Sequence, residues 1–570
     1  MAAKEDGFVD ISVSLSRRPP GDNRVGETTT TIYDKIAKTI KHTLIFQIGG
    51  LANSAYGFLL LPLYVRHINT KEYGILALLI VALTFLTILF RFGLNQSFFA
   101  EYYQTDDPKQ RKEVVGSALI FLVLACAAGL MVLYPFSRQI SALILGGDET
   151  RTWLMQLVLV DCFFEVITLI PDSILRANFK SARYSALNVV ALAVQLAAIS
   201  YIVLRVDPSA NGVIVGRLIG SVFEAALFFW AVRQDLSLHF SSARLKSMLA
   251  FGSPLILGQL LSMLFVMIDR FFVVRYTSVP DVGVYALSNQ IVMVIAILIT
   301  GPFGQVWNVM RFSVMKEKGA EEYYSRVLTY IVLASMFLAV CVAAVAGDGL
   351  ILEGLRSYWP CATIVPLLAL ASVFDNAGGV LNVGITLRKR TIYSPIVTGT
   401  ALAVNIALNF LLIPRYGIMG ASISTLLSYI AFCGVRFSVS NLFIKIQYDW
   451  TRVFTSTAVG GSVILIFYSI DYLRGVSPSR GTIYMSLGIK TCLALLFPLM
   501  LYAIGFYEQA ERKRIREFAR TLYVLARRAA GTGGGSSGPS TADSESAAAL
   551  QRAELNKAAQ GELPAPKEID

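Results

Sequence analysis

The sequence predicts an all-α polytopic membrane protein with about fourteen transmembrane helices. Hydrophobic residues make up 55% of the 570 residues and charged residues only 15%, against about 25% charged residues in an ordinary soluble domain. Apolar windows of roughly 20 residues, the length that spans a bilayer core, recur from residue 43 to residue 505. Basic residues gather in the short loops between these windows, as the positive-inside rule describes.

The N-terminal segment precedes the first apolar window. Residues 1–30 are polar and lack an early apolar stretch, so we expect a disordered N-terminus without a cleaved signal peptide. Residues 31–42 place three isoleucines on one helical face with three lysines beside them. This pattern predicts a short amphipathic helix at the membrane surface.

The fourteen predicted spans alternate in direction across the bilayer. Their limits are 43–65, 74–99, 114–134, 152–175, 184–205, 211–232, 250–274, 283–308, 327–347, 359–383, 393–413, 417–438, 452–472 and 481–505. With the N-terminus in the cytoplasm, the inside loops hold 19 basic residues and the outside loops hold 10. The positive-inside rule therefore places both termini in the cytoplasm.

An internal repeat divides the chain. At an offset of 209 residues, Val65, Arg66 and Gly74 align with Val274, Arg275 and Gly283, and Tyr184-Ser185 aligns with Tyr393-Ser394. The repeat unit holds six spans, an even number, so the two halves have the same orientation and form parallel repeats. Two further spans follow the second half.

The predicted organisation follows from this repeat and from composition. It comprises a disordered N-terminus (1–30), an N-lobe with the amphipathic helix and spans 1–6 (31–240), a C-lobe with spans 7–12 (241–447), spans 13–14 (448–505), a basic interfacial helix (506–530) and a disordered tail (531–570). The basic helix would be attracted to anionic lipid.

Polar side chains inside the spans are the candidates for function, because a charge in hydrocarbon costs at least a few kcal/mol. Arg91 and Asn95 share a face of span 2, Asp161 and Glu165 share a face of span 4, and Arg217 lies in span 6. Single polar residues often only join helices. For the charged side chains, we give equal weight to a role in lining a water-filled cavity. An arginine in such a cavity can form bidentate hydrogen bonds with a phosphate.

The second half carries its own candidates. Asp269 and Arg270 are adjacent in span 7, Asn308 and Arg311 lie at the end of span 8, and Asp375 lies in span 10. No nucleophile elbow, phosphate-binding loop or metal-ligand spacing is found, so we expect neither enzymatic activity nor a metal or other cofactor. The net charge of +12 lies in loops rather than on one soluble face, which argues against nucleic acid as a partner.

Several local motifs resemble a known family. The sequence is similar to the polysaccharide-transporter branch of the multidrug/oligosaccharidyl-lipid/polysaccharide exporter superfamily, the Wzx-like polysaccharide or O-antigen flippases, over about residues 40–505. The matching segments are Phe251-Gly-Ser-Pro254-Leu, Asp269-Arg-Phe, Val282-Gly-Val-Tyr-Ala286, Asn409-Phe-Leu-Leu-Ile-Pro414-Arg-Tyr-Gly417-Ile-Met-Gly-Ala421 and Phe92-Gly-Leu94. The resemblance implies two six-helix lobes in a V-shaped arrangement around a central cavity.

The resemblance also implies a function. Such proteins flip undecaprenyl-diphosphate-linked oligosaccharide repeats from the cytoplasmic to the periplasmic leaflet of the bacterial inner membrane, with membrane lipids, a polysaccharide polymerase and a chain-length regulator as partners. In this interpretation Arg91, Arg217 and Arg270, with Asn95, Asn308 and Arg311, contact the head group. The carboxylates of Asp161, Glu165, Asp269 and Asp375 bind a coupling ion. A drug/cation antiporter of the same superfamily and a membrane polysaccharide polymerase or ligase remain the alternatives.

Overall fold

The computed structural model describes most of the chain between residues 56 and 516. The described residues are 56–105, 107–147, 149–178, 181–315, 319–352, 356–388, 390, 392–474, 479–509, 511–513 and 516. The predictions for residues 1–42, for most of the basic helix 506–530 and for the tail 531–570 fall outside these residues.

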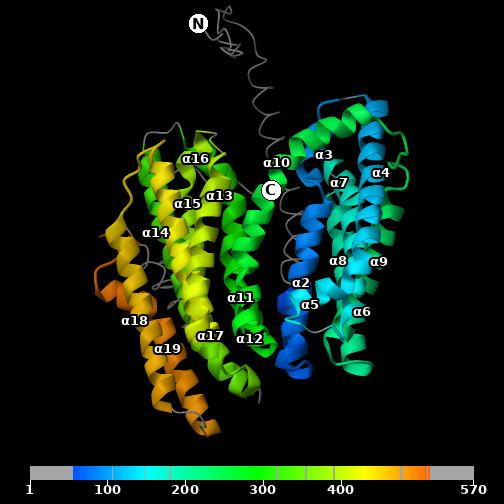
Figure 1. Cartoon of the computed structure of the whole chain (residues 1–570). Helices are drawn as coiled ribbons and strands as arrows, with labels where there is room; N and C mark the ends of the chain where they lie inside the picture. Colours follow the sequence, from blue (N-terminus) through cyan, green and yellow to red (C-terminus); the bar gives the residue numbers. More distant parts are fainter. Residues whose placement is uncertain are drawn as a thin grey trace, which may run out of the picture. The chain divides into compact units, whose positions relative to one another are not determined.

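Helices account for the regular structure, and no strand occurs among the described residues (Figure 1). Residues 56–67 are helical and precede α2. The elements that follow are α2 Thr70–Phe90, α3 Leu94–Tyr102, α4 Pro108–Leu133, η1 Tyr134–Phe136, α5 Ser137–Ile144, α6 Thr152–Ile167, α7 Leu169–Ala177, α8 Ser181–Arg205, α9 Ala210–Val232, α10 Ser242–Met267, α11 Asp269–Tyr276, α12 Val279–Ile295, the π-helix η2 Ala296–Thr300, α13 Gly301–Ser313, α14 Ala320–Leu352, η3 Arg356–Tyr358, α15 Cys361–Leu381, α16 Val383–Leu387, α17 Tyr393–Asn441, α18 Trp450–Arg474 and α19 Arg480–Ala503.

Twelve helical stretches in the described residues are long and apolar enough to cross a membrane. Two features reconcile this number with about fourteen predicted spans. The 49-residue α17 covers the predicted spans 393–413 and 417–438, and Gly417 between them has non-helical angles of φ 58° and ψ −136°. Most of the first predicted span, 43–65, lies outside the described residues. The predicted class, an all-α multi-pass membrane protein, is therefore confirmed.

Two groups of helices pack together within the compact unit Met1–Met500, which is distinct from the unit Leu501–Asp570. In the first bundle, α9 packs against α6 and α8, and α6 packs against α2 and α4. In the second bundle, α15 packs against α12, α14 and α17, and α17 also packs against α10 and α11. The two bundles contain the helices of the two predicted halves.

The repeat is visible at the start of α2 and α12. The side chain of Asn69 caps α2 by accepting a hydrogen bond from the backbone N–H of Glu72 at 2.9 Å. The side chain of Ser278, 209 residues later, caps α12 by accepting one from the N–H of Asp281 at 3.4 Å. Both helices thus begin with an N-cap residue and an acid three residues on, an arrangement that satisfies free backbone donors.

The same two helices cross through a reciprocal glycine contact. A Cβ atom on Gly74 would lie 2.0 Å from the carbonyl oxygen of Val279, and a Cβ atom on Gly283 would lie 2.0 Å from that of Thr70. Thr70 and Gly74 are the repeat counterparts of Val279 and Gly283. The contact is therefore self-complementary, as in an interface between two-fold related copies, which agrees with parallel repeats.

The helix α10 contacts both bundles. At its start, Arg244 donates to the carboxylate of Glu101 at 2.7 Å, and Ser247 donates to the same carboxylate at 2.7 Å. Further along, α10 passes so close to the first bundle that a Cβ atom on Gly93 would lie 2.1 Å from the carbonyl oxygen of Gly252. The end of α10 places Phe265 in the apolar core of the second bundle.

The last two spans are joined to the second bundle by a buried ion cluster. Lys490 of α19 is 1% exposed and lies 3.2 Å from the carboxylate of Asp348 in α14 and 2.5 Å from that of Asp471 in α18. Ser486 also donates to Asp348, at 3.0 Å. A buried charge requires such partners, so this cluster specifies how α18 and α19 dock.

Candidate functional site

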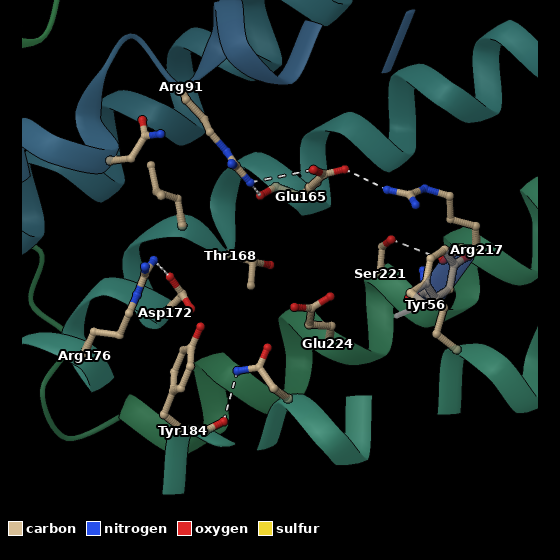
Figure 2. A pocket seen from close by; sticks show the side chains of 14 residues that line it. Tyr56, Arg91, Glu165, Thr168, Asp172, Arg176, Tyr184, Arg217, Ser221 and Glu224 are labelled. Carbon is tan, nitrogen blue, oxygen red and sulfur yellow. Dashed lines mark hydrogen bonds and ion pairs between the residues drawn. The ribbon is translucent and has the colours of Figure 1, made fainter. Parts of the chain in front are cut away.

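A polar cavity of about 550 Å³ lies within the first bundle (Figure 2). Its lining residues are Tyr56, Arg91, Asn95, Glu165, Thr168, Leu169, Asp172, Arg176, Tyr184, Asn188, Gln195, Arg217, Ser221 and Glu224. Four of them were candidates from the sequence. A fifth candidate, Asp161, forms an ion pair with Arg217. The structure thus brings together the polar residues of predicted spans 2, 4 and 6.

A break between α2 and α3 positions Arg91. The helix α2 ends at Phe90, and Phe92 and Gly93 adopt positive φ angles of 50° and 71° before α3 begins. A positive φ is uncommon for a residue other than glycine and costs about 1–3 kcal/mol. Arg91 lies at this break. Its guanidinium donates to the backbone carbonyl of Glu165 at 3.3 Å.

A second break, between α6 and α7, continues the acidic side of the cavity. Pro171 has no N–H to bond the carbonyl of Ile167, which explains why α6 ends there. At the break, the hydroxyl of Thr168 donates to the backbone carbonyl of Phe164 at 2.7 Å. Helical periodicity then keeps Asp161, Glu165 and the residues of α7 on one side.

Ion pairs cross this cavity from helix to helix. The guanidinium of Arg217 lies 2.7 Å from the carboxylate of Asp161 and 2.9 Å from that of Glu165. Arg91 lies 3.7 Å from the carboxylate of Glu165, and Arg176 pairs with Asp172 on the same helix. Each arginine of the cavity therefore has an acidic partner, a pairing that the sequence did not reveal for Arg91 and Arg217.

Asp269 forms a separate centre in the second bundle. Its carboxylate is buried and accepts hydrogen bonds from Tyr285, Thr425 and Asn409, each at 2.7 Å. Asn409 also donates to Asn405 at 2.9 Å. Among the described residues, Asp269 forms no ion pair, not even with the adjacent Arg270. Its hydrogen-bond donors are all neutral, while the adjacent Arg270 interacts with it electrostatically from beyond ion-pair distance.

The other candidates of the second half form no hydrogen bond or ion pair with Asp269 among the described residues. Arg270 interacts electrostatically with Tyr73 of α2, at the contact between the two bundles, and also with Tyr285 and Asp269. Asn308 is exposed on α13, and Arg311 lies over the ring of Phe312. Within the described part of the chain, neither Arg270 nor Arg311 forms an ion pair.

Asp375 lies on α15 and its carboxylate is 4.0 Å from the guanidinium of Arg436. That guanidinium also lies 3.7 Å from the centre of the Phe432 ring. The carboxylate thus forms an ion pair, whereas that of Asp269 forms none among the described residues. No group of three or more His, Cys, Asp or Glu side chains suited to a metal ion occurs among the described residues.

Sequence reasoning missed part of the first cavity. Tyr184, Asn188 and Gln195 reach it from α8 at positions i, i+4 and i+11, a spacing that places them on one helical face. The helical spacing was the available signal for each of these residues.

The chain is similar to several known proteins. The sequence pattern of a family described as "Polysaccharide biosynthesis protein" matches residues 63–360. A Shigella flexneri protein provisionally designated an O-antigen transporter is 21% identical over 388 residues, which cover 66% of this chain and 90% of the relative. Both matches agree with the resemblance that the sequence motifs indicated.

Solved structures with the same fold include two transporters. The lipid II flippase MurJ in an inward closed conformation has a TM-score of 0.64 at 14% identity, covering 81% of this chain and 100% of that chain. An inward-facing multidrug resistance transporter of the MATE family has a TM-score of 0.54 at 16% identity, covering 69% of this chain and 94% of that chain. At these identities the likeness concerns the fold.

Proposed function

Because the chain belongs to the polysaccharide biosynthesis protein family, we propose that it is a flippase for a lipid-linked oligosaccharide. Its substrate is an undecaprenyl-diphosphate-linked repeat unit of a surface polysaccharide, which it moves from the cytoplasmic to the periplasmic leaflet. The designation of the Shigella relative as an O-antigen transporter and the name of the lipid II flippase support this proposal. We place the protein in the bacterial inner membrane with both termini in the cytoplasm.

The observation that carries the proposal is the polar cavity within a bundle of membrane-spanning helices. Charged side chains in a membrane are expensive and mark substrate or ion pathways. An oligosaccharide head group needs such a polar environment, whereas its lipid tail can stay in hydrocarbon. Two repeated halves that meet at the Gly74–Gly283 crossing provide the elements for alternating access.

We propose that Arg270 and Arg311 contact the diphosphate more directly than Arg91 and Arg217. A guanidinium without a carboxylate partner in the described residues can form bidentate hydrogen bonds with a phosphate. Arg91 and Arg217 are already paired with Glu165, and Arg217 also with Asp161. Their role in this proposal is to shape the cavity, together with the amide of Asn95, while Asn308 lies one turn before Arg311.

A coupling ion is best accommodated at Asp269. The carboxylate is buried and forms no ion pair within 4 Å among the described residues, and the nearby Oδ1 of Asn409 has no hydrogen-bond partner. A carboxylate with amide and hydroxyl oxygens around it can take a sodium ion or, more simply, a proton. Asp161, Glu165 and Asp375 are less suited to this role because each of them forms an ion pair with an arginine.

Deletion of the gene tests the proposed function. In a host without a redundant flippase, we expect lipid-linked repeats to accumulate on the inner leaflet and the surface polysaccharide to disappear. Complementation with Arg270→Ala should restore little polysaccharide, whereas Arg205→Ala, at the exposed end of α8, serves as the matched control and should restore it fully. Normal surface polysaccharide in the deletion strain would refute the proposal. Drug sensitivity with unchanged polysaccharide would favour an antiporter instead.

A further inference from the structure

Glu224 lines the first cavity but takes part in none of the ion pairs described there. Its carboxylate points into the cavity from α9, opposite the side chains of Glu165 and Thr168 (Figure 2). Among the described residues it forms no ion pair and no hydrogen bond, although Arg217 lies two turns earlier on the same helix. The other three acids, in contrast, each have an arginine partner.

Among the residues that the structure describes, the charges around this cavity do not balance. Three guanidinium groups face it, from the break after α2, from α7 and from α9, and four carboxylates face it or pair with one of these groups. The guanidinium groups are those of Arg91, Arg176 and Arg217, and the carboxylates are those of Asp161, Glu165, Asp172 and Glu224. The tyrosines, Tyr56 and Tyr184, are neutral, so the described groups of the ionised cavity carry one excess negative charge.

One monovalent positive charge would neutralise the cavity. An uncompensated charge away from bulk water is costly, and such a group normally neutralises rather than remaining ionised. A proton needs only the carboxylate itself.

The cavity also offers a route for that proton. Its volume of about 550 Å³ exceeds that of several water molecules, each of which occupies about 30 Å³. Its lining consists almost entirely of polar and charged side chains, which offer hydrogen bonds to water. A wet cavity lets a proton reach Glu224 without opening the bundle.

We propose that Glu224 is the proton-exchanging group of the first bundle, protonated and deprotonated while the four arginine–acid ion pairs stay intact. This inference rests on the proposed function only in taking that proton as a driving ion of transport. It differs from the centre at Asp269, which lies in the other bundle and accepts three hydrogen bonds. The two bundles therefore differ in their chemistry: one has an unpaired acid in a wet cavity, the other an acid whose hydrogen-bond donors are all neutral.

Infrared difference spectroscopy of the purified full-length protein tests this role without any substrate. Spectra are recorded in alkaline and in mildly acidic buffer, in a detergent without ester groups, so that the carbonyl band of a protonated carboxylic acid is visible. A solvent-exposed glutamate has a pKa of about 4.3 and stays largely ionised in such a buffer. The wild type should gain a carboxylic acid band on acidification, and Glu224→Gln should lose it.

Two further variants make the outcome decisive. Glu224→Asp keeps a carboxyl group and should keep the band at a shifted frequency, and Glu321→Gln, which removes an exposed glutamate of α14, should match the wild type. An unchanged band in Glu224→Gln, with an unchanged unfolding midpoint, would overturn the inference. If the wild type gives the Glu224 band but moves no lipid-linked oligosaccharide, the proposed function fails and the proton site stands.

Discussion

The reciprocal glycine crossing of α2 and α12 makes a quantitative prediction. In Gly74→Ala the new methyl group would lie 2.0 Å from the carbonyl oxygen of Val279. Ordinary close contacts between carbon and oxygen are about 3.3–3.6 Å. The obstacle is backbone rather than a flexible side chain, so the two helices must separate by roughly 1.3 Å or more at this point.

The cost of that separation can be estimated. Overpacking a close contact costs typically about 1–3 kcal/mol, and 1–3 kcal/mol corresponds to about a 5- to 150-fold change in a two-state equilibrium. We therefore expect Gly74→Ala to shift the protein away from the conformation with α2 and α12 in contact. Because Gly283→Ala places its methyl group against Thr70 in the same contact, it should have the same effect. The double variant should cost less than the sum, since one separation relieves both clashes.

Distance measurements between two spin labels test this prediction. Lys71 and Tyr276 are exposed near the starts of the two helices, and cysteines introduced there can be labelled after the six native cysteines are replaced. The label distance should increase or broaden in Gly74→Ala. The matched control is Gly434→Ala in α17, where a Cβ atom meets nothing within 4 Å. An unchanged distance distribution in Gly74→Ala, relative to this control, would refute the reasoning.

Three further substitutions test the buried charges. Arg217→Ala leaves Asp161, which is 1% exposed, without its partner, and should lower the stability by about 3–5 kcal/mol; an unchanged thermal unfolding midpoint would contradict the ion-pair assignment. Lys490→Ala should cost about the same because it strands Asp348, which is 0% exposed, whereas Lys490→Met with Asp348→Asn should recover much of the loss. Asp269→Asn keeps the shape of the side chain but removes its charge, so the protein should fold normally and lose ion-dependent transport; transport that still follows the ion gradient would exclude Asp269 as the coupling site.

Helical spacing in the sequence predicted which polar side chains of the site share a helix face. Asp161 and Glu165 are one turn apart, so they were expected on one face. The structure shows that both carboxylates pair with the guanidinium of Arg217. The repeat offset of 209 likewise identified Gly74 and Gly283 as counterparts, because equivalent positions in parallel repeats have the same local packing.

Contacts between distant helices could not be read in the same way. Helical periodicity says which side chains share a face but not which face of another helix lies opposite. The pairing of Arg217 with two acids, and the absence of a partner for Glu224 among the described residues, depend on the relative rotation of α6 and α9. The break at Phe92, which needs a positive φ, is also fixed by tertiary packing against Gly252 rather than by its own preference.

Translocation in a defined membrane tests the central claim most directly. The purified protein would be reconstituted into liposomes with a fluorescent undecaprenyl-diphosphate-linked oligosaccharide, and an impermeant quencher added outside would report the fraction in the outer leaflet. We expect protein-dependent exchange between the leaflets, with a rate that Arg270→Ala lowers and Arg205→Ala does not. An outer-leaflet fraction that stays the same with and without the protein would contradict the proposed flippase activity.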